Sequence, residues 1–539
     1  MLLLAFFLLA APPPDLAATA APGLAAIRPD ALSAHVRFLA DDLLEGRGTG
    51  TRGHAIAARY VATRLQSLGY APAGDKQTYF QRVPFFGMSV QPAQSAFELD
   101  GAALRFGEEV IFFPRAGSAS DDVSGELVFA GYGVRAPEYG YDDVPKDLKG
   151  KIAVVLFGAP RSDRPDFFPT AASAVYSDGW RKARLLAERG AVGVVTVLTP
   201  EMTKHLPFSF AAKQAAFEAM IHREGNKPGS GSALPSARVP PELLGRLFAK
   251  SGHDAAHVFV DGLAGKLRPF PLGVRGRLRV SAALRQFDSE NVVAVLRGGE
   301  RANEYVALTA HLDHLGIGAP VGGDSIYNGA SDNASGVSAV LEIARAFAAL
   351  PQRPPRSILI AIVTAEEKGL QGSDYFAGHP TVPIDSIVAN VNIDGVGWSS
   401  EPFDIIAAGA ENSTLSRAVG AALPILGFKE SPDPEPEQVF FIRSDQYSFV
   451  KRGIPCVNPA SGWLDGDGKT EKRKAEDEWQ TKNRYHQPGD EWDPAGNYEF
   501  MAKEVRVDFL ISLAIALDPE RPRWNPGDVF EKLFGRRGN

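Results

Sequence analysis

Four apolar runs in the second half of the chain have the length and composition of buried strands. They span residues 292–296, 305–310, 358–364 and 387–393, and a helical pattern at 337–350 separates the second run from the third. Continuous apolar runs of this length are typical of parallel strands that are covered on both faces. The alternation therefore predicts an α/β fold in which a mixed, largely parallel sheet is flanked by helices.

The first half of the chain carries two other patterns. Residues 28–69 have helical periodicity and residues 80–110 alternate like short strands, whereas strand-like runs at 152–157 and 192–198 flank a helical stretch at 180–190. An alanine-rich stretch at 211–221 indicates a further helix. We predict a main domain formed by residues 28–115 and 285–520, a smaller domain inserted at 120–284, and a peripheral tail at 521–539.

The N-terminal residues indicate an export signal. Residues 2–10 are apolar and stop at three prolines, which is too short for a membrane-spanning helix. Small residues follow, and Ala18-Thr19-Ala20 has the pattern of a signal-peptidase site. These features predict a signal peptide at 1–20 and an exported protein, periplasmic or secreted, with no membrane anchor. No basic residue precedes Arg28, which departs from the usual pattern of a signal peptide.

Composition and charge exclude several classes of protein. Hydrophobic residues make up 45% of the chain and charged residues 22%, which are the values of a globular protein. The formal net charge is −7, without a long Lys/Arg block, so we do not expect a nucleic-acid partner. The one cysteine, Cys456, can close no intramolecular disulfide and can build no cysteine-rich metal cage. Any metal must therefore be held by histidines and carboxylates.

Polar residues follow three of the four predicted strands. His311 and Asp313 follow the second strand, Glu366 and Glu367 the third, and Asp394 the fourth. In open α/β sheets, ligands gather outside the carboxyl ends of the strands. We therefore expect these side chains to meet at one edge of the sheet.

Together with His311, Asp332 and His486 further along the chain complete the expected ligand set. In an extended segment His311 and Asp313 point the same way, so the Asp313 carboxylate is expected to accept the ring proton of His311 and to leave the other nitrogen for a metal. His314 is out of phase with them and is not expected in the site. Asp332 lies in a tight turn before a helix, where its two oxygens could bridge two cations, and His486 lies in a polar loop far downstream.

The combination is more informative than its parts. Acidic pairs at helix starts, Asp-Asn turns and loop histidines are common where no metal binds. Two histidines, two aspartates and one glutamate, however, form a nitrogen and oxygen set that Zn²⁺ accepts. If Asp332 is shared, each of two ions has three protein ligands and an open position, which is typical of catalytic sites.

The order of these motifs resembles the family of two-zinc exopeptidases that includes the bacterial leucyl aminopeptidases and glutamate carboxypeptidase. The motifs are His311-x-Asp313, Asp332-Asn-Ala-Ser-Gly336, Glu366-Glu367, Asp394 and His486. The resemblance implies two Zn²⁺ per chain and a zinc exopeptidase fold. It assigns His311 and Asp394 to one zinc, Glu367 and His486 to the other, and Asp332 to both, with a cis peptide bond after Asp332.

The same resemblance implies roles for residues around the metals. Glu366 would be the general acid/base that acts on a zinc-activated water, and Asp313 would orient His311. Tyr485 would hydrogen-bond the scissile carbonyl, as a tyrosine does in some relatives. Gln446 departs from a family segment that often reads Ser-Asp-His. The charged stretch 461–483 is expected to rim the cleft.

The inserted domain resembles a protease-associated domain. The resemblance is carried by residues 129–133, Phe-Ala-Gly-Tyr-Gly, and 149–153, Lys-Gly-Lys-Ile-Ala. Such a domain implies either a shield over the cleft or a surface that recruits a protein partner.

The function implied by the resemblance is a zinc-dependent metallo-aminopeptidase that removes N-terminal residues from peptide substrates. A carboxypeptidase or dipeptidase of the same family is an alternative, and would need arginines such as Arg443 or Arg484 in the pocket. A single-zinc glutaminyl cyclase and a catalytically silent, receptor-like binding module are further alternatives.

Overall fold

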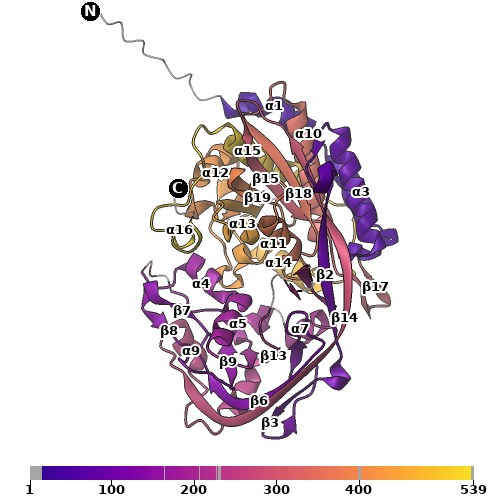
Figure 1. Ribbon diagram of the computed structural model, residues 1–539. Helices are drawn as coiled ribbons and strands as arrows, with labels where there is room; N and C mark the ends of the chain where they lie inside the picture. Colours follow the sequence, from indigo (N-terminus) through magenta and orange to yellow (C-terminus); the bar gives the residue numbers. More distant parts are fainter. Residues whose placement is uncertain are drawn as a thin grey trace, which may run out of the picture.

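The computed structural model describes residues 15–535, apart from 163, 165, 206, 226, 229–231 and 398–401. Most of the predicted signal peptide, residues 1–14, lies outside the described residues. A larger and a smaller α/β unit share two long strands, β2 (Phe80–Val90) and β14 (Phe270–Leu296). In Figure 1 these strands sweep from the upper unit into the lower one.

A mixed sheet forms the centre of the larger unit. Its parallel strands lie in the order β18 (Arg356–Val363), β15 (Arg301–His311), β19 (Ile387–Asn392) and β22 (Cys456–Ser461). Antiparallel neighbours flank them, with β14 beside β18 and β20 (Asp404–Ala408) beside β22. The mixed, largely parallel sheet predicted from the apolar runs is confirmed.

The central strands are apolar on both faces because helices cover both faces. In β18 every residue is buried, and successive side chains enter opposite cores, as Ile358 and Leu359 do. Helices α10 (Gly336–Ala349) and α15 (Tyr498–Leu517) contribute to the first core. Helices α11 (Gln371–Gly378) and α13 (Gln446–Val450) contribute to the second.

Three N-terminal helices extend the first core. They are α1 (Leu16–Ala26), α2 (Pro29–Leu39) and α3 (Arg52–Ser67). The predicted cleavage motif Ala18-Thr19-Ala20 lies within α1, and Ala20 is completely buried. Cleavage after Ala20 would remove part of a helix that packs on α10 and α15. Export stays a prediction. None of the described helices is both long and apolar enough to cross a bilayer.

The smaller unit is a second mixed sheet with its own core. Its parallel strands lie in the order β6 (Ser120–Phe129), β9 (Ile152–Leu156), β10 (Gly193–Val197) and β13 (Ser236–Val239). The sheet also takes in β3 (Ala96–Leu99) and β5 (Ile111–Phe113), which the sequence analysis assigned to the main domain. Phe97 and Phe112 lie in its core. The boundary differs from the predicted one because β14 runs on from one sheet into the other and pairs with β3 in the smaller unit.

Two other segments differ from the sequence-based expectations. The stretch 211–221 is divided between helix α7 (Phe208–Gln214) and strand β11 (Ala219–Glu224), since residues 219–222 pair antiparallel with β2. The C-terminal tail, predicted to be peripheral, packs against the main unit as far as residue 535. Trp524 and Phe530 are buried against the second core, and α16 (Val529–Phe534) packs there.

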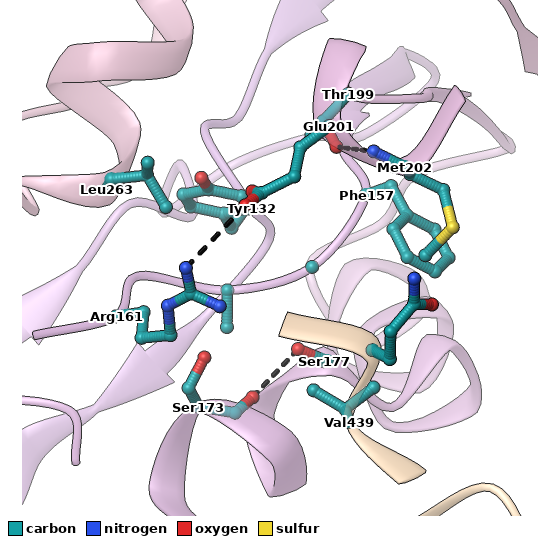
Figure 2. A pocket seen from close by; sticks show the side chains of 13 residues that line it. Tyr132, Phe157, Arg161, Ser173, Ser177, Thr199, Glu201, Met202, Leu263 and Val439 are labelled. Carbon is teal, nitrogen blue, oxygen red and sulfur yellow. Dashed lines mark hydrogen bonds and ion pairs between the residues drawn. The ribbon is translucent and has the colours of Figure 1, made fainter. Parts of the chain in front are cut away.

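A small cavity lies where the inserted unit meets residues 438–439 of the main unit (Figure 2). Arg161 and Glu201 form an ion pair of 3.7 Å beside Tyr132 on its wall. Its volume of about 50 Å³ accommodates one or two water molecules. The cavity is therefore too small for a peptide, and none of the candidate ligands lines it.

Helix α15 carries a buried carboxyl group beneath the loop that follows β19. Glu504 accepts a hydrogen bond of 3.0 Å from the Gly397 N–H and another from the Ser461 hydroxyl. Burial raises the pKa of Glu504 from its ordinary value of 4.5 to about 7, although these hydrogen bonds and Arg473 oppose the shift. The folded protein therefore holds a proton on Glu504 more tightly than the unfolded chain does.

We expect Glu504→Gln to remove a pH-dependent loss of stability. Because the folded pKa is raised, the wild type loses stability as pH rises from about 4.5 through about 7. At pH 8 the variant should be the more stable protein by on the order of 2 kcal/mol, and at pH 4.5 the two should be equal. Urea unfolding at both pH values measures this difference. The exposed Glu499→Gln on the same helix should change stability by less than about 0.5 kcal/mol at either pH.

Candidate metal centre

The carboxyl ends of β15, β18 and β19 bring the predicted ligands together. In the parallel register His311 lies beside Val363 and Thr309 beside Asn392, so the residues after Val363 and Asn392 emerge at one edge. At this edge His311 Nε2 is 3.0 Å from Asp394 Oδ1. The convergence of the strand ends predicted from the sequence is confirmed.

Asp332 lies between two groups of potential ligands. Its Oδ1 atom is 3.1 Å from His311 Nε2, in the group with Asp394. Its Oδ2 atom is 3.2 Å from His486 Nε2, which in turn is 3.1 Å from Glu367 Oε2. One carboxylate thus faces both groups with different oxygens, the arrangement needed to bridge two cations.

His314, which the sequence analysis left out, also lies in the second group. Its Nδ1 atom is 2.7 Å from Glu367 Oε1 and 4.0 Å from Asp332 Oδ1, and its side chain is fully buried. The prediction that His314 points away from the site is wrong. Strand β15 ends at His311, so the alternation of side chains does not extend to residue 314.

The donor atoms fit a divalent cation. His314 Nδ1 and Glu367 Oε1 are buried and close together, yet neither makes an aligned hydrogen bond within the part of the chain that the structure describes. Buried polar atoms are normally satisfied, and two that face each other without a hydrogen bond are well placed to share a cation. Imidazole nitrogens and carboxylate oxygens are ligands that zinc accepts.

The turn that carries Asp332 is tied to the loop that carries Asp394. The Asn333 side chain donates to the Ile393 carbonyl at 3.0 Å and accepts from the Gly395 N–H at 3.0 Å. The peptide bond between Asp332 and Asn333 is cis, as the resemblance implies. The two hydrogen bonds of Asn333 hold the Asp332 turn and the Asp394 loop at a fixed separation.

A second tie joins Asp332 to the loop that carries His486. The buried Asp490 carboxylate accepts hydrogen bonds from the backbone N–H groups of Ser331, at 2.9 Å, and Asp332, at 3.1 Å. His486 has a φ of 52°, a left-handed backbone conformation that few residues other than glycine adopt. No local pattern in the sequence gives Asp490 this role, because its partners are 158 and 159 residues away.

Asp313 occupies a different position from the predicted one. The ring of His311 bonds through Nδ1 to the main-chain carbonyl of Asp313 at 2.9 Å, while the nearer carboxylate oxygen is 4.0 Å away. The carboxylate instead accepts the Glu366 N–H at 3.0 Å and the Thr49 hydroxyl at 3.1 Å. Because the strand ends at His311, the carbonyl and not the side chain of Asp313 meets the ring.

Glu366 and Glu367 differ in environment although they are adjacent. Ala365 has a φ of 56°, which turns the chain at the end of β18. Both residues are partly buried, and only 3% of the Glu367 side chain is exposed. Burial raises the pKa of Glu366 well above its ordinary value, and the charges of Asp394 and Glu367 add to this. Burial by itself would raise the pKa of Glu367, but His486 and His314 together lower it below its ordinary value. Glu366 is thus suited to exchange a proton and Glu367 to remain an anion.

Tyr485 lies beside the second group of ligands. Its ring stacks on His486 with a centroid distance of 4.0 Å, and its hydroxyl accepts a hydrogen bond of 3.3 Å from Arg443 Nη2. Arg484 is directed elsewhere, 4.0 Å from Asp493. Of the two arginines considered from the sequence, Arg443 is the one that the fold brings to a candidate site residue.

A buried arginine binds the backbone of the segments that carry the candidate ligands. Arg47 is 1% exposed and donates to the carbonyls of Leu312, Asn328 and Gly329 at 2.6 to 2.9 Å. Burial lowers the pKa of Arg47 to about 10. The segments that carry His314 and Asp332 are thereby fixed to the N-terminal helices, which no local pattern in the sequence indicates.

The comparison with protein families gives a specific match. Residues 291–503, which contain every candidate ligand, match the model of peptidase family M28. We refer to the part of the protein that carries this match as the M28 domain. The family assignment predicted from the motifs is confirmed.

The relatives of the M28 domain are zinc metalloproteases and carboxypeptidases by name. A probable zinc metalloprotease of Leptosphaeria maculans is 34% identical over 153 residues, which are 27% of this chain and 35% of that protein. A probable glutamate carboxypeptidase of Arabidopsis thaliana is 32% identical over 177 residues, 32% of this chain and 23% of that protein. The chain thus spans about a third or less of the length of these curated relatives.

A solved structure shares the overall fold. The aminopeptidase from Aneurinibacillus sp. strain AM-1 superposes with a TM-score of 0.53 and 19% sequence identity. The superposition covers 94% of this chain and 97% of that one. The arrangement of the M28 domain with a second α/β unit therefore recurs in another protein.

We expect the two histidines beside Glu367 to differ in their effect on bound zinc. His486 contacts both Asp332 and Glu367, so His486→Ala should lower the zinc content by about one ion per chain. His314 approaches mainly Glu367, so His314→Ala should keep the stoichiometry but weaken zinc retention by on the order of 10- to 100-fold. Elemental analysis before and after dialysis against a competing chelator measures both effects. A loss of one ion in His314→Ala with full retention in His486→Ala would exchange the two roles.

Proposed function

We propose that the protein is a zinc aminopeptidase that removes N-terminal residues from peptides. The observation that carries this proposal is the position of Asp332, with one oxygen toward the His311–Asp394 group and the other toward the His486–Glu367 group. The match to peptidase family M28 supports peptide hydrolysis. The zinc content we propose is two ions per chain.

Different residues bind the metal and transfer the proton during hydrolysis. His311, Asp332, Asp394, Glu367 and His486 would hold the metal. Bound zinc supplies Lewis acidity, which activates water and polarises a carbonyl. Glu366, partly exposed beside these ligands, accepts the proton of the attacking water and later donates it to the leaving amine. Its raised pKa makes the Glu366 carboxylate a stronger base than an ordinary glutamate, which favours acceptance of the proton of water.

Two other residues position these groups. Asp313 accepts the Glu366 N–H and thereby fixes the backbone from which the base projects. The Tyr485 hydroxyl, held by Arg443, is proposed to donate a hydrogen bond to the scissile carbonyl, where negative charge develops.

The charge of the site favours an amino terminus. The side chains of Asp332 and Asp394 are 19% and 23% exposed, so carboxylates form the open part of the ligand groups. Carboxylate oxygens that zinc does not use can accept hydrogen bonds from a free α-ammonium group, whereas they offer no donor to a free carboxylate. This is the physical reason to prefer an aminopeptidase.

One observation favours the carboxypeptidase alternative. Arg443 reaches Tyr485, and a guanidinium group is the side chain best suited to bind a substrate carboxylate. Its bonds to Tyr485 and to the Gln438 carbonyl already use part of its donors. A single arginine so engaged is weaker support than the acidic rim.

Removal of the Glu366 carboxylate should abolish most of the activity. We expect Glu366→Gln to lower kcat by on the order of 10²- to 10⁴-fold, because the amide cannot accept the proton of water. Zinc content should stay unchanged, since Glu366 is not among the proposed ligands. The exposed Glu300→Gln, made as a control, should keep full activity. Full activity of Glu366→Gln would refute the role of this residue.

Blocking the chain ends should identify the specificity. Leucine p-nitroanilide is expected to be hydrolysed, and its N-acetylated form should be cleaved at least 10²-fold more slowly, because the free amine is lost from the acidic rim. An N-acetylated tripeptide with a free carboxylate serves as the opposite probe. Release of its C-terminal residue at the faster rate would establish the carboxypeptidase function instead.

A further inference from the structure

One segment of the inserted unit crosses onto the M28 domain and reaches the metal centre. Strand β11 pairs with β2, and within it His222 Nε2 is 3.1 Å from Asp374 Oδ2 on helix α11. The His222 N–H also donates to Gln371 Oε1 at 2.8 Å. These bonds anchor the C-terminal end of the segment beside the strand that leads to Glu366 and Glu367.

The middle of the segment makes a second contact with the catalytic side. The ring of Phe217 packs edge-on against Tyr327 at a centroid distance of 5.2 Å. The ammonium group of Lys368, which follows Glu367, lies 5.2 Å from the centre of the same ring. The segment is therefore fixed on both sides of the ligand groups, and helix α7 directly precedes it.

Helix α7 places Phe210 at the metal centre. Its ring centroid is 6.2 Å from that of Tyr485 and 6.3 Å from that of His486, and the planes are inclined by 18° and 20°. Because the two distances are nearly equal, Phe210 lies beside the stacked Tyr485–His486 pair and not on top of it. The three rings form one continuous aromatic surface that begins at a candidate zinc ligand.

The described ligand groups themselves offer little apolar surface. The open part of the ligand groups is carboxylate, from Asp332 and Asp394, and the far end of Tyr485 is capped by Arg443. Phe210 is only partly buried, so its ring has surface to offer to a bound group. An apolar side chain next to the scissile bond would gain free energy by covering it.

We propose that Phe210 of the inserted unit is a specificity-determining residue that contacts the apolar side chain of the substrate's N-terminal residue. The inserted unit thereby takes part in substrate selection and does not merely flank the domain. This inference rests on the proposed aminopeptidase function.

The test compares tripeptides of the form X-Gly-Gly, in which X is Phe, Leu or Ala, so that the residues after the scissile bond stay constant. Phe210→Ala should lower kcat/KM for Phe-Gly-Gly and Leu-Gly-Gly by about 10-fold or more, and for Ala-Gly-Gly by less than about 2-fold. Phe210→Leu should restore most of the activity on Leu-Gly-Gly. Zinc content and thermal unfolding should match those of the wild type in both variants.

A matched control is available in the same unit. Phe106 is 39% exposed. Its ring stacks on that of Phe112, which is buried in the core of the inserted unit. Phe106→Ala removes an exposed aromatic ring from the insert and should leave all three rates unchanged. Equal effects of Phe210→Ala on the three peptides, or no effect on any, would overturn the inference while the wild type remains active. A wild type that cleaves none of them would instead refute the proposed function.

Discussion

Asp332 is the side chain on which both ligand groups depend. Its two oxygens face imidazoles from opposite ends of the M28 segment, His311 and His486, and a displacement of its turn would separate both groups at once. The fold therefore fixes that turn from several directions. Asn333 binds it to the loop after β19, and Asp490 binds it to the His486 loop. Arg47 binds the preceding carbonyls to the N-terminal helices.

The same constraint explains why adjacent residues differ in chemistry. Glu366 and Glu367 follow one strand, but past the turn at Ala365 the Glu367 carboxylate lies against His486 and His314, whereas, among charged groups, Glu366 is influenced mainly by His311 and Asp394. Burial and neighbouring carboxylates raise the pKa of Glu366, whereas the imidazoles lower that of Glu367. A single strand end thus provides one group that can carry a proton and one that stays charged.

Strand pairing connects the inserted unit to the M28 domain. Strand β14 passes through both sheets, and β11 returns to pair with β2 in the sheet of the M28 domain. The path places helix α7 next to the metal centre although more than 270 residues separate Phe210 from His486 in the sequence. An insertion of this kind can alter which side chains the site accepts without changing the ligands themselves.

The sequence by itself determined the strands of the central sheet and the edge where His311, Glu367 and Asp394 meet, because continuous apolar runs and the residues that end them are local properties. The motifs also identified the family before any fold was known. Local phase was misleading at His314 and Asp313, since it assumes a strand that has already ended. The roles of Arg47, Asp490 and Phe210 were decided by the tertiary structure alone. Each acts on partners far away in the chain, and no local pattern records which distant segments folding will bring together.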